Sequence, residues 1–198
     1  MRVRPMAAFA GLAAALLLAV AGAAPLGAQN PAVPEPDGYR MSDYRAPVPA
    51  GLVGATTVST PELRALLDAA DPILIDVLPR PRKPDNLPAT ALWMPKPRDN
   101  IPGSAWLANV GFGEMSAEFA DYFRDNLERL SGGDKSRGLV FYCLADCWMS
   151  WNAAKRAMGY GYSNVYWYPE GSDGWAAAGL PLEPAEPAPM PGFLPPPS

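Results

Sequence analysis

Three short apolar runs constrain the fold of this chain more than any other feature of its sequence. Residues 72–78 (PILIDVL), 139–142 (LVFY) and 165–168 (VYWY) contain one charged side chain between them, that of Asp76. Runs of this length are typical of strands that are buried on both faces of a parallel sheet. Segments with apolar residues at helical spacing alternate with them, at residues 60–67, 116–130 and 150–158, and a short helix is expected at residues 175–178. Strands that alternate with helices predict an α/β domain with a parallel sheet.

Capping residues predict where the helices begin and end. Thr60 followed by Pro61 is typical of a helix start, so we expect Thr60 to be the N-cap. Residues 56–58 (TTV) suggest a short strand just before it, and Gly132 and Gly133 end the second helix.

The two ends of the chain differ from the domain between them. A basic start, an apolar run at residues 7–20 and small residues at 21–28 predict a cleaved signal peptide over residues 1–28. The apolar run is too short for a membrane anchor, so we expect an exported chain with no anchor after cleavage. Residues 29–54 predict an extended, proline-rich lead-in, and residues 184–198 a proline-rich tail.

Charge and residue types exclude several kinds of partner and site. The chain has 16 basic and 20 acidic side chains, and the signal peptide takes two arginines with it, which leaves 14 against 20. This balance argues against nucleic acid or an anionic membrane as the main partner. The absence of histidine removes Ser-His and Cys-His nucleophile pairs, imidazole metal sites and haem attachment through Cys-x-x-Cys-His.

Both cysteines lie at one expected turn from strand to helix, with three residues between them. A helix start lowers the pKa of a thiol and stabilises a thiolate or a persulfide, whereas the carboxylate of Asp146 would raise that pKa if it lay close. If the turn is helical, Cys143 and Cys147 share one face with poor disulfide geometry. If the loop curls, the two sulfurs can meet, with Cys143 as the nucleophile and Cys147 as the resolving thiol.

Three alternatives remain for this pair of cysteines. They can carry redox or sulfur chemistry, they can form a structural disulfide or stay inert, or they can bind Cu(I) together with the soft ligand Met149. The absence of histidine disfavours copper, and a structural zinc site needs four ligands, so we predict no metal. Trp148, within the same loop, is either a ligand contact or a packing residue.

Residues 79–100 form a long basic and proline-rich insertion. A loop of this length inside a compact domain is usually functional. Sites in parallel sheets lie at the carboxyl ends of the strands, and the insertion follows such an end. It therefore either folds over the cysteine loop and supplies a cation, or lies remote from it. We assign four residues to the rim of the site, with the first as a structural hydrogen-bond acceptor rather than a catalytic acid: Asp76, Arg80, Arg82 and Glu170.

Several segments resemble, in order, the landmarks of a rhodanese domain. They are residues 74–77 (LIDV), 101–105 (IPGSA), Tyr142 with Cys143, residues 161–166, and residues 174–181. The resemblance spans roughly residues 55–183 and implies a single rhodanese-like α/β domain of three layers with a mostly parallel central sheet. It also implies that Cys143 accepts sulfur as a persulfide. The backbone N–H groups of the loop would then form an anion cradle, made by Leu144, Ala145, Asp146, Trp148, Met149 and Ser150.

Residues 147–154 (CWMSWNAA) and 166–171 (YWYPEG) more closely resemble the exported PQQ-dependent catabolism-associated CXXCW motif proteins. This resemblance implies a periplasmic protein that accompanies PQQ-dependent alcohol oxidation. It implies a small sulfur-containing or redox substrate, and a quinoprotein dehydrogenase or cytochrome c as a partner. The alternative is a non-catalytic accessory protein that binds a quinoprotein, its cytochrome or a redox cofactor, with a structural Cys143–Cys147 disulfide.

Two features depart from these family patterns. Three residues separate the cysteines here, whereas the motif name implies two. The cysteine loop also has neither the glycine nor the cation with which rhodaneses help to hold an anionic sulfur donor.

Overall fold

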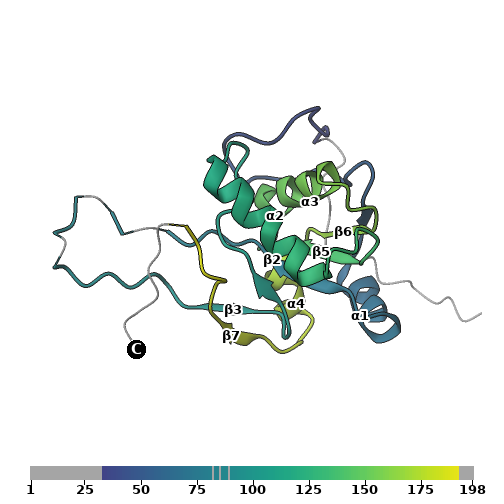
Figure 1. Cartoon of the computed structure of the whole chain (residues 1–198). Coiled ribbons are helices and arrows are strands. Elements are labelled where there is room, and N and C mark those ends of the chain that lie inside the picture. The colour runs from purple at the N-terminus through teal and green to yellow at the C-terminus, as the bar shows by residue number, and fades with distance from the viewer. Residues whose placement is uncertain (1–32, 82, 85, 89, 192–198) are drawn as a thin grey trace, which may run out of the picture.

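The structure is a computed structural model that describes residues 33–81, 83–84, 86–88 and 90–191 (Figure 1). The predicted signal peptide, Arg82 and residues 192–198 of the predicted tail lie outside the described residues. No helix within the described residues is long and apolar enough to cross a membrane.

The central sheet of the described region has five strands, all parallel, in the order β1-β6-β5-β2-β4. The three apolar runs form its three inner strands, β2 (Ile73–Asp76), β5 (Leu139–Tyr142) and β6 (Val165–Tyr168), and the outer two are β1 (Thr56–Thr57) and β4 (Ala105–Trp106). All four residues of β5 are fully buried, because helices cover both faces of the sheet. The predicted parallel α/β fold is confirmed.

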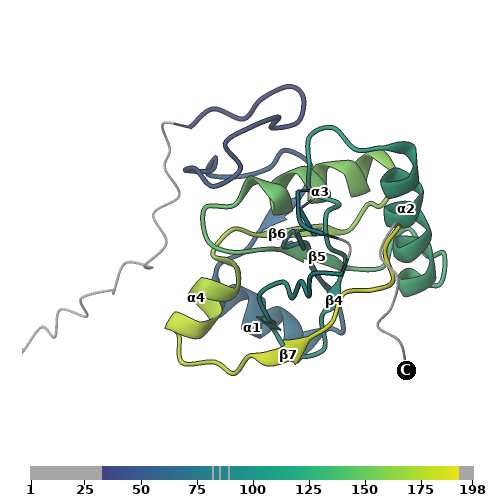
Figure 2. The same ribbon diagram turned by 90° about the vertical axis from the view of Figure 1, so that its left-hand side faces the viewer.

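Four helices of the described region form the outer two layers. α2 (Ala117–Ser131) and α3 (Trp148–Gly159) cover one face of the sheet, and α1 (Thr60–Ala69) and α4 (Gly171–Ala177) cover the other (Figure 2). Each face has its own apolar cluster. Phe123 of α2 packs with Phe141 on the first face, and Leu63 of α1 and Trp175 of α4 lie in the cluster on the second. The three-layer arrangement is therefore also confirmed.

The helix starts differ from the sequence predictions. Ser59, and not Thr60, is the N-cap of α1: the carboxylate of Glu62 accepts hydrogen bonds from the Ser59 N–H and hydroxyl. Thr60 is buried, and its hydroxyl bonds to Tyr168 and Glu170 instead. α3 begins two residues before the predicted start and α4 begins four residues before it. Bonds to distant segments, which local spacing does not reveal, hold these first turns: the Trp148 N–H donates to the Tyr44 carbonyl, and the Ser172 N–H donates to the Cys143 carbonyl.

Most of the insertion projects from the body of the domain as an extended loop (Figure 1). Leu92 and Met94 of the insertion are largely exposed. The end of the insertion returns to the body as β3 (Arg98–Asn100), which pairs antiparallel with β7 (Glu183–Ala185). Most of the insertion therefore lies remote from the cysteine loop, which is the second of the two predicted alternatives. Arg98 at its end, however, is buried in the protein interior.

Candidate active site

The two cysteines meet at the carboxyl end of the central strand. Cys143 directly follows β5, and Cys147 is the N-cap of α3. Between them, Asp146 has a φ of 49°, in the left-handed region that Asp tolerates better than most residues. The loop consequently curls, and the two sulfur atoms lie 2.9 Å apart and share a hydrogen bond. Both are free thiols, with exposed fractions of 0% for Cys143 and 3% for Cys147.

The two thiols differ in acidity. The pKa of Cys147 is lowered to about 7, chiefly by its hydrogen bond with Cys143, with contributions from the N–H of Met149 and the charge of Arg45. The pKa of Cys143 is raised well above its ordinary value, chiefly because burial penalises the thiolate, and Cys147 and the carboxylate of Asp76 add to the shift. Cys147 is therefore the more acidic of the two thiols.

The sequence predicted that the helix start would lower the pKa of Cys143 and that the carboxylate of Asp146 would raise it, but in the structure both effects involve other residues. The helix start that lowers a thiol pKa favours Cys147, because Cys147 and not Cys143 is the N-cap. Asp146, expected to oppose this effect, is exposed. The carboxylate that raises the pKa of Cys143 belongs to Asp76.

A buried ion pair lies directly beneath the cysteine loop. Asp76 accepts a hydrogen bond from the Leu78 N–H at 2.9 Å and one from Arg98 Nε at 2.7 Å. Arg98 also donates to Ser172 Oγ at 2.9 Å and to the Cys143 carbonyl at 3.5 Å. Burial raises the pKa of Asp76, and the guanidinium of Arg98 opposes this shift. The ion pair of Asp76 and Arg98 thus connects the end of β2, the insertion and the cysteine loop.

Arg98 is a site residue that sequence reasoning placed only among the cations of the insertion. A signal was present, since a buried aspartate at a strand end requires a partner. The sequence did not show which of the basic residues that follow Asp76 would be that partner.

The start of α4 holds the other side of the loop. Gly171 has a φ of 58°, and a Cβ there would lie 2.6 Å from the Cys143 carbonyl oxygen, so only glycine permits this approach. Ser172 donates its N–H to the same carbonyl at 3.0 Å, and Asp173 accepts from the Ala145 N–H at 3.1 Å. Glu170, assigned to the rim, instead accepts hydrogen bonds from Thr60 at the start of α1.

Residues 33–54, named the strap below, run along α3 and close the site (Figures 1 and 2). Arg45 and Cys147 form an isolated antiparallel bridge, and the Trp148 N–H donates to the Tyr44 carbonyl at 2.9 Å. The indole of Trp148 is 2% exposed and donates to the Pro47 carbonyl at 3.1 Å. Of its two alternative roles, Trp148 therefore takes the packing one.

Side chains of α3 anchor the strap. The amide of Asn152 exchanges two hydrogen bonds with the backbone of Arg40, each 2.9 Å long, and donates a third to Gly111 O. Lys155 Nζ donates to the carbonyls of Pro36 and Asp37, and the guanidinium of Arg40 lies over the ring of Trp148. Asn152 and Lys155 thus hold the strap against α3.

The predicted anion cradle is partly occupied by internal contacts. The N–H groups of Ala145 and Trp148 already donate to Asp173 and Tyr44. Those of Leu144 and Met149 face the sulfur of Cys147 and lower its pKa.

Ser150 and Met149 are buried beneath the loop. The hydroxyl of Ser150 donates to the Cys147 carbonyl and accepts from the Trp167 indole. Met149 is 1% exposed, and its backbone packs so closely on Gly111 that a Cβ there would lie 2.4 Å from the Met149 carbonyl oxygen. Both residues therefore support the shape of the loop.

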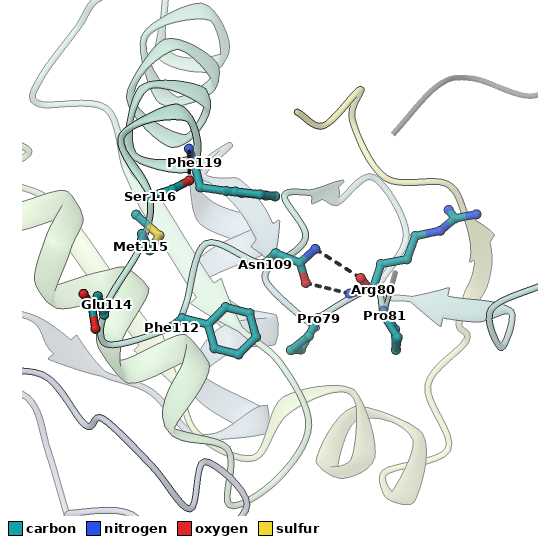
Figure 3. Close-up of a pocket in the computed structure, with 9 residues that line it drawn as sticks. All are labelled: Pro79, Arg80, Pro81, Asn109, Phe112, Glu114, Met115, Ser116 and Phe119. Atoms are coloured by element: carbon teal, nitrogen blue, oxygen red, sulfur yellow. Dashed lines mark hydrogen bonds between the residues drawn. The ribbon is translucent and has the colours of Figure 1, made fainter. Parts of the chain in front are cut away.

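Arg80 lies away from the sulfurs, beside a cavity of about 420 Å³. The cavity is lined by the segment after β2 and by the segment between β4 and α2 (Figure 3). The backbone of Arg80 exchanges hydrogen bonds with the Asn109 side chain, and its guanidinium pairs with Glu186 at 2.9 Å. Neither cysteine lines this cavity. In the part of the chain that the structure describes, no three His, Cys, Asp or Glu side chains gather as metal ligands would.

The sequence of the domain matches a known protein family. The family model of the Rhodanese-like domain matches residues 59–178, more than half of the chain. No curated protein is significantly similar in sequence.

Solved structures are similar at low identity. A thiosulfate sulfurtransferase from Pseudomonas aeruginosa is 18% identical over 71% of this chain and 22% of its own, with a TM-score of 0.45. An uncharacterized protein from Saccharomyces cerevisiae is 22% identical over 63% and 93%, with a TM-score of 0.40. A polysulfide-sulfur transferase homodimer from Wolinella succinogenes is 23% identical over 65% and 78%, with a TM-score of 0.40. This chain therefore spans about a fifth of the Pseudomonas protein.

Proposed function

We propose, since the chain belongs to the rhodanese-like domain family, that it transfers sulfur through the paired thiols of Cys143 and Cys147. The observation that carries this proposal is the 2.9 Å contact between the two sulfur atoms at the strand-to-helix turn. One thiol accepts sulfur from a small donor as a persulfide, and the other lies within reach of it. The family resemblance assigns the acceptor role to Cys143.

The surroundings of the pair suit this chemistry. The N–H groups of Leu144 and Met149 stabilise negative charge on sulfur. Arg45, on the exposed side of the strap, supplies a positive charge opposite Cys147. This cation stands in for the one that the cysteine loop lacks, so an anionic sulfur donor has a partner at the site.

Release of sulfite from thiosulfate tests the proposal. The reduced protein should release sulfite, while the double variant Cys143→Ser/Cys147→Ser should release none. The double variant must keep the circular dichroism spectrum and melting profile of the parent protein. If parent and double variant behave alike towards thiosulfate and towards polysulfide, the chain does not transfer sulfur.

The proposed setting of this activity is the periplasm, beside PQQ-dependent alcohol oxidation. It rests on the predicted signal peptide and on the resemblance of residues 147–154 and 166–171 to the CXXCW motif proteins. A quinoprotein dehydrogenase or its cytochrome c is the proposed partner. Osmotic-shock release of a chain that lacks residues 1–28 tests the location. Loss of growth on alcohols, but not on organic acids, after deletion of the gene tests the pathway.

A second candidate function follows from the burial of both thiols. A pair that is 0% and 3% exposed beneath the strap also suits a structural disulfide in a non-catalytic accessory protein that binds a quinoprotein, its cytochrome or a redox cofactor. In that case mild reductant would leave a Cys143–Cys147 disulfide intact, and replacing both cysteines by serine would not change growth on alcohols.

A further inference from the structure

The two thiols are placed so that a bound sulfur is released within the protein. We infer that Cys147 takes sulfane sulfur from an anionic donor and that Cys143 then displaces it as sulfide, which leaves a Cys143–Cys147 disulfide. The inference rests on the proposed function and goes beyond it: it gives the acceptor role to Cys147 instead of Cys143, to which the family resemblance assigns that role, and it names the product. It makes the protein a reductase of sulfane sulfur rather than a carrier that hands the sulfur on.

Three observations assign the first attack to Cys147. It is the N-cap of a twelve-residue helix, where backbone N–H groups and the helix dipole favour a thiolate. Arg45 lies opposite it across the antiparallel bridge, and side chains of bridge partners lie on the same side of the ladder. Cys147 keeps 3% of its surface exposed, whereas Cys143 lies beneath the loop with none. The lowered pKa of Cys147 and the raised pKa of Cys143 agree with this order.

The position of Cys143 determines what happens after the sulfur is bound. Its Sγ lies 2.9 Å from Cys147 Sγ, and a disulfide bond is about 2.05 Å long, so a movement of about 1 Å joins them. Gly171 and Ser172 hold the Cys143 backbone from the other side, which keeps the thiol aimed at its partner. A reaction between groups held this close has a large advantage over attack by a thiol from solution.

Both steps balance. In the first, the Cys147 thiolate attacks the outer sulfur of thiosulfate, the sulfur–sulfur bond of the donor breaks, and sulfite leaves with the bonding electron pair. In the second, Cys143 attacks Cys147 Sγ, the persulfide bond breaks, and the outer sulfur leaves as HS⁻ with the proton of the Cys143 thiol. The sulfane sulfur gains two electrons, and the two thiols lose them to form the disulfide.

A further turnover therefore needs an external two-electron reductant of the dithiol class. Such a dithiol attacks the Cys143–Cys147 disulfide, becomes a disulfide itself, and restores both thiols. Without it, each protein molecule releases one sulfide and stops.

A single-turnover experiment tests the inference. The full mature chain is reduced, freed of reductant under anaerobic conditions and mixed with thiosulfate, after which sulfite, sulfide and intact mass are measured. We expect about one sulfite and one sulfide per chain, and a mass lower by two hydrogens. Cys143→Ser should release sulfite but no sulfide and gain one sulfur atom, while Cys147→Ser should remain unloaded.

The alternative outcomes are distinct. A parent protein that gains one sulfur, keeps it and releases no sulfide overturns the inference and leaves the proposed function standing. Loading of Cys147→Ser together with an inert Cys143→Ser overturns the order of the two thiols. Absence of sulfur uptake by all three proteins, from thiosulfate and from polysulfide, overturns the proposed function itself. The parent protein alone decides the first of these, so a variant that fails to fold does not prevent the test.

Discussion

Replacing Asn152 with alanine should open the strap and expose Cys147 to alkylation. The amide of Asn152 accepts from the Arg40 N–H and donates to the Arg40 carbonyl, and Arg40 lies five residues before Arg45, which pairs with Cys147. Its third bond, to Gly111 O, lies within the domain and is kept whether or not the strap is docked. The substitution therefore removes two bonds that belong specifically to the closed strap.

The size of the effect follows from these two bonds. A hydrogen bond of this kind contributes about 1 kcal/mol net, so the closed strap should lose about 2 kcal/mol relative to the open one. Because every 1.4 kcal/mol is a factor of ten, the population of the open form should rise about 30-fold. Both thiols are nearly inaccessible when the strap is closed, so the alkylation rate should rise by the same factor if opening equilibrates faster than the reagent reacts.

The assay is alkylation of the reduced protein by iodoacetamide at constant pH, followed by intact mass. Asn126→Ala is the matched control, because the amide of Asn126 bonds only within α2, and its rate should stay near that of the parent. Small additions of urea separate strap opening from global unfolding, since local opening depends weakly on denaturant. An unchanged rate in Asn152→Ala, or a rise that follows only global stability, would refute the role of the strap.

Three further predictions concern charge at the site. Replacing Arg98 with methionine should lower the free energy of unfolding by about 3–5 kcal/mol, because Asp76 is then buried without its partner; denaturation in urea measures this, and parental stability would contradict it. Alkylation of Cys147 should rise with pH around a midpoint near 7, and Cys143→Ala should move that midpoint upward, because the hydrogen bond with Cys143 is the largest cause of the lowered pKa. Because the pKa of Cys147 is about 7 in the folded protein and 9.0 for an ordinary thiol, this residue adds to the free energy of unfolding at pH values above 9.0. The contribution is lost as the pH falls through about 7. Replacing the exposed Arg45 with glutamine should slow sulfite release at low salt by up to about fivefold and weaken its salt dependence; equal rates at all salt concentrations would show that Arg45 does not attract the donor.

The inner strands could be predicted from the sequence because burial on both faces requires an apolar residue at nearly every position. Residues 139–142 meet this condition locally, and the structure buries all four. Of the two outer strands, β1 (Thr56–Thr57) is expected from residues 56–58, whereas β4 contains two residues, too few to produce a pattern. The start of α4 could not be found either, because Gly171 and Ser172 are poor helix formers whose place depends on their contacts with Cys143.

In the candidate site, too, some features could be predicted from neighbouring residues and others depend on contacts between distant segments. Cys143 and Cys147 could be recognised because a thiol at a strand-to-helix turn has a known chemical consequence, and both lie within one short segment. Whether their sulfurs meet depends on the φ of Asp146 and on the packing around the loop. Arg98 and Asp76 are 22 residues apart and meet only because the projecting insertion returns to the sheet.

By itself, the sequence determined the class of fold, the inner strands and the turn that carries both thiols, because each depends on residues that are neighbours in the chain. Only the tertiary structure decided which thiol is the more acidic, which residue pairs with Asp76, and which contacts Trp148 and Asn152 make. The partners of these last two residues, Pro47 and Arg40, lie 101 and 112 residues away. Local patterns show that a side chain is to be buried or bonded, but contact between distant segments depends on how the whole chain packs.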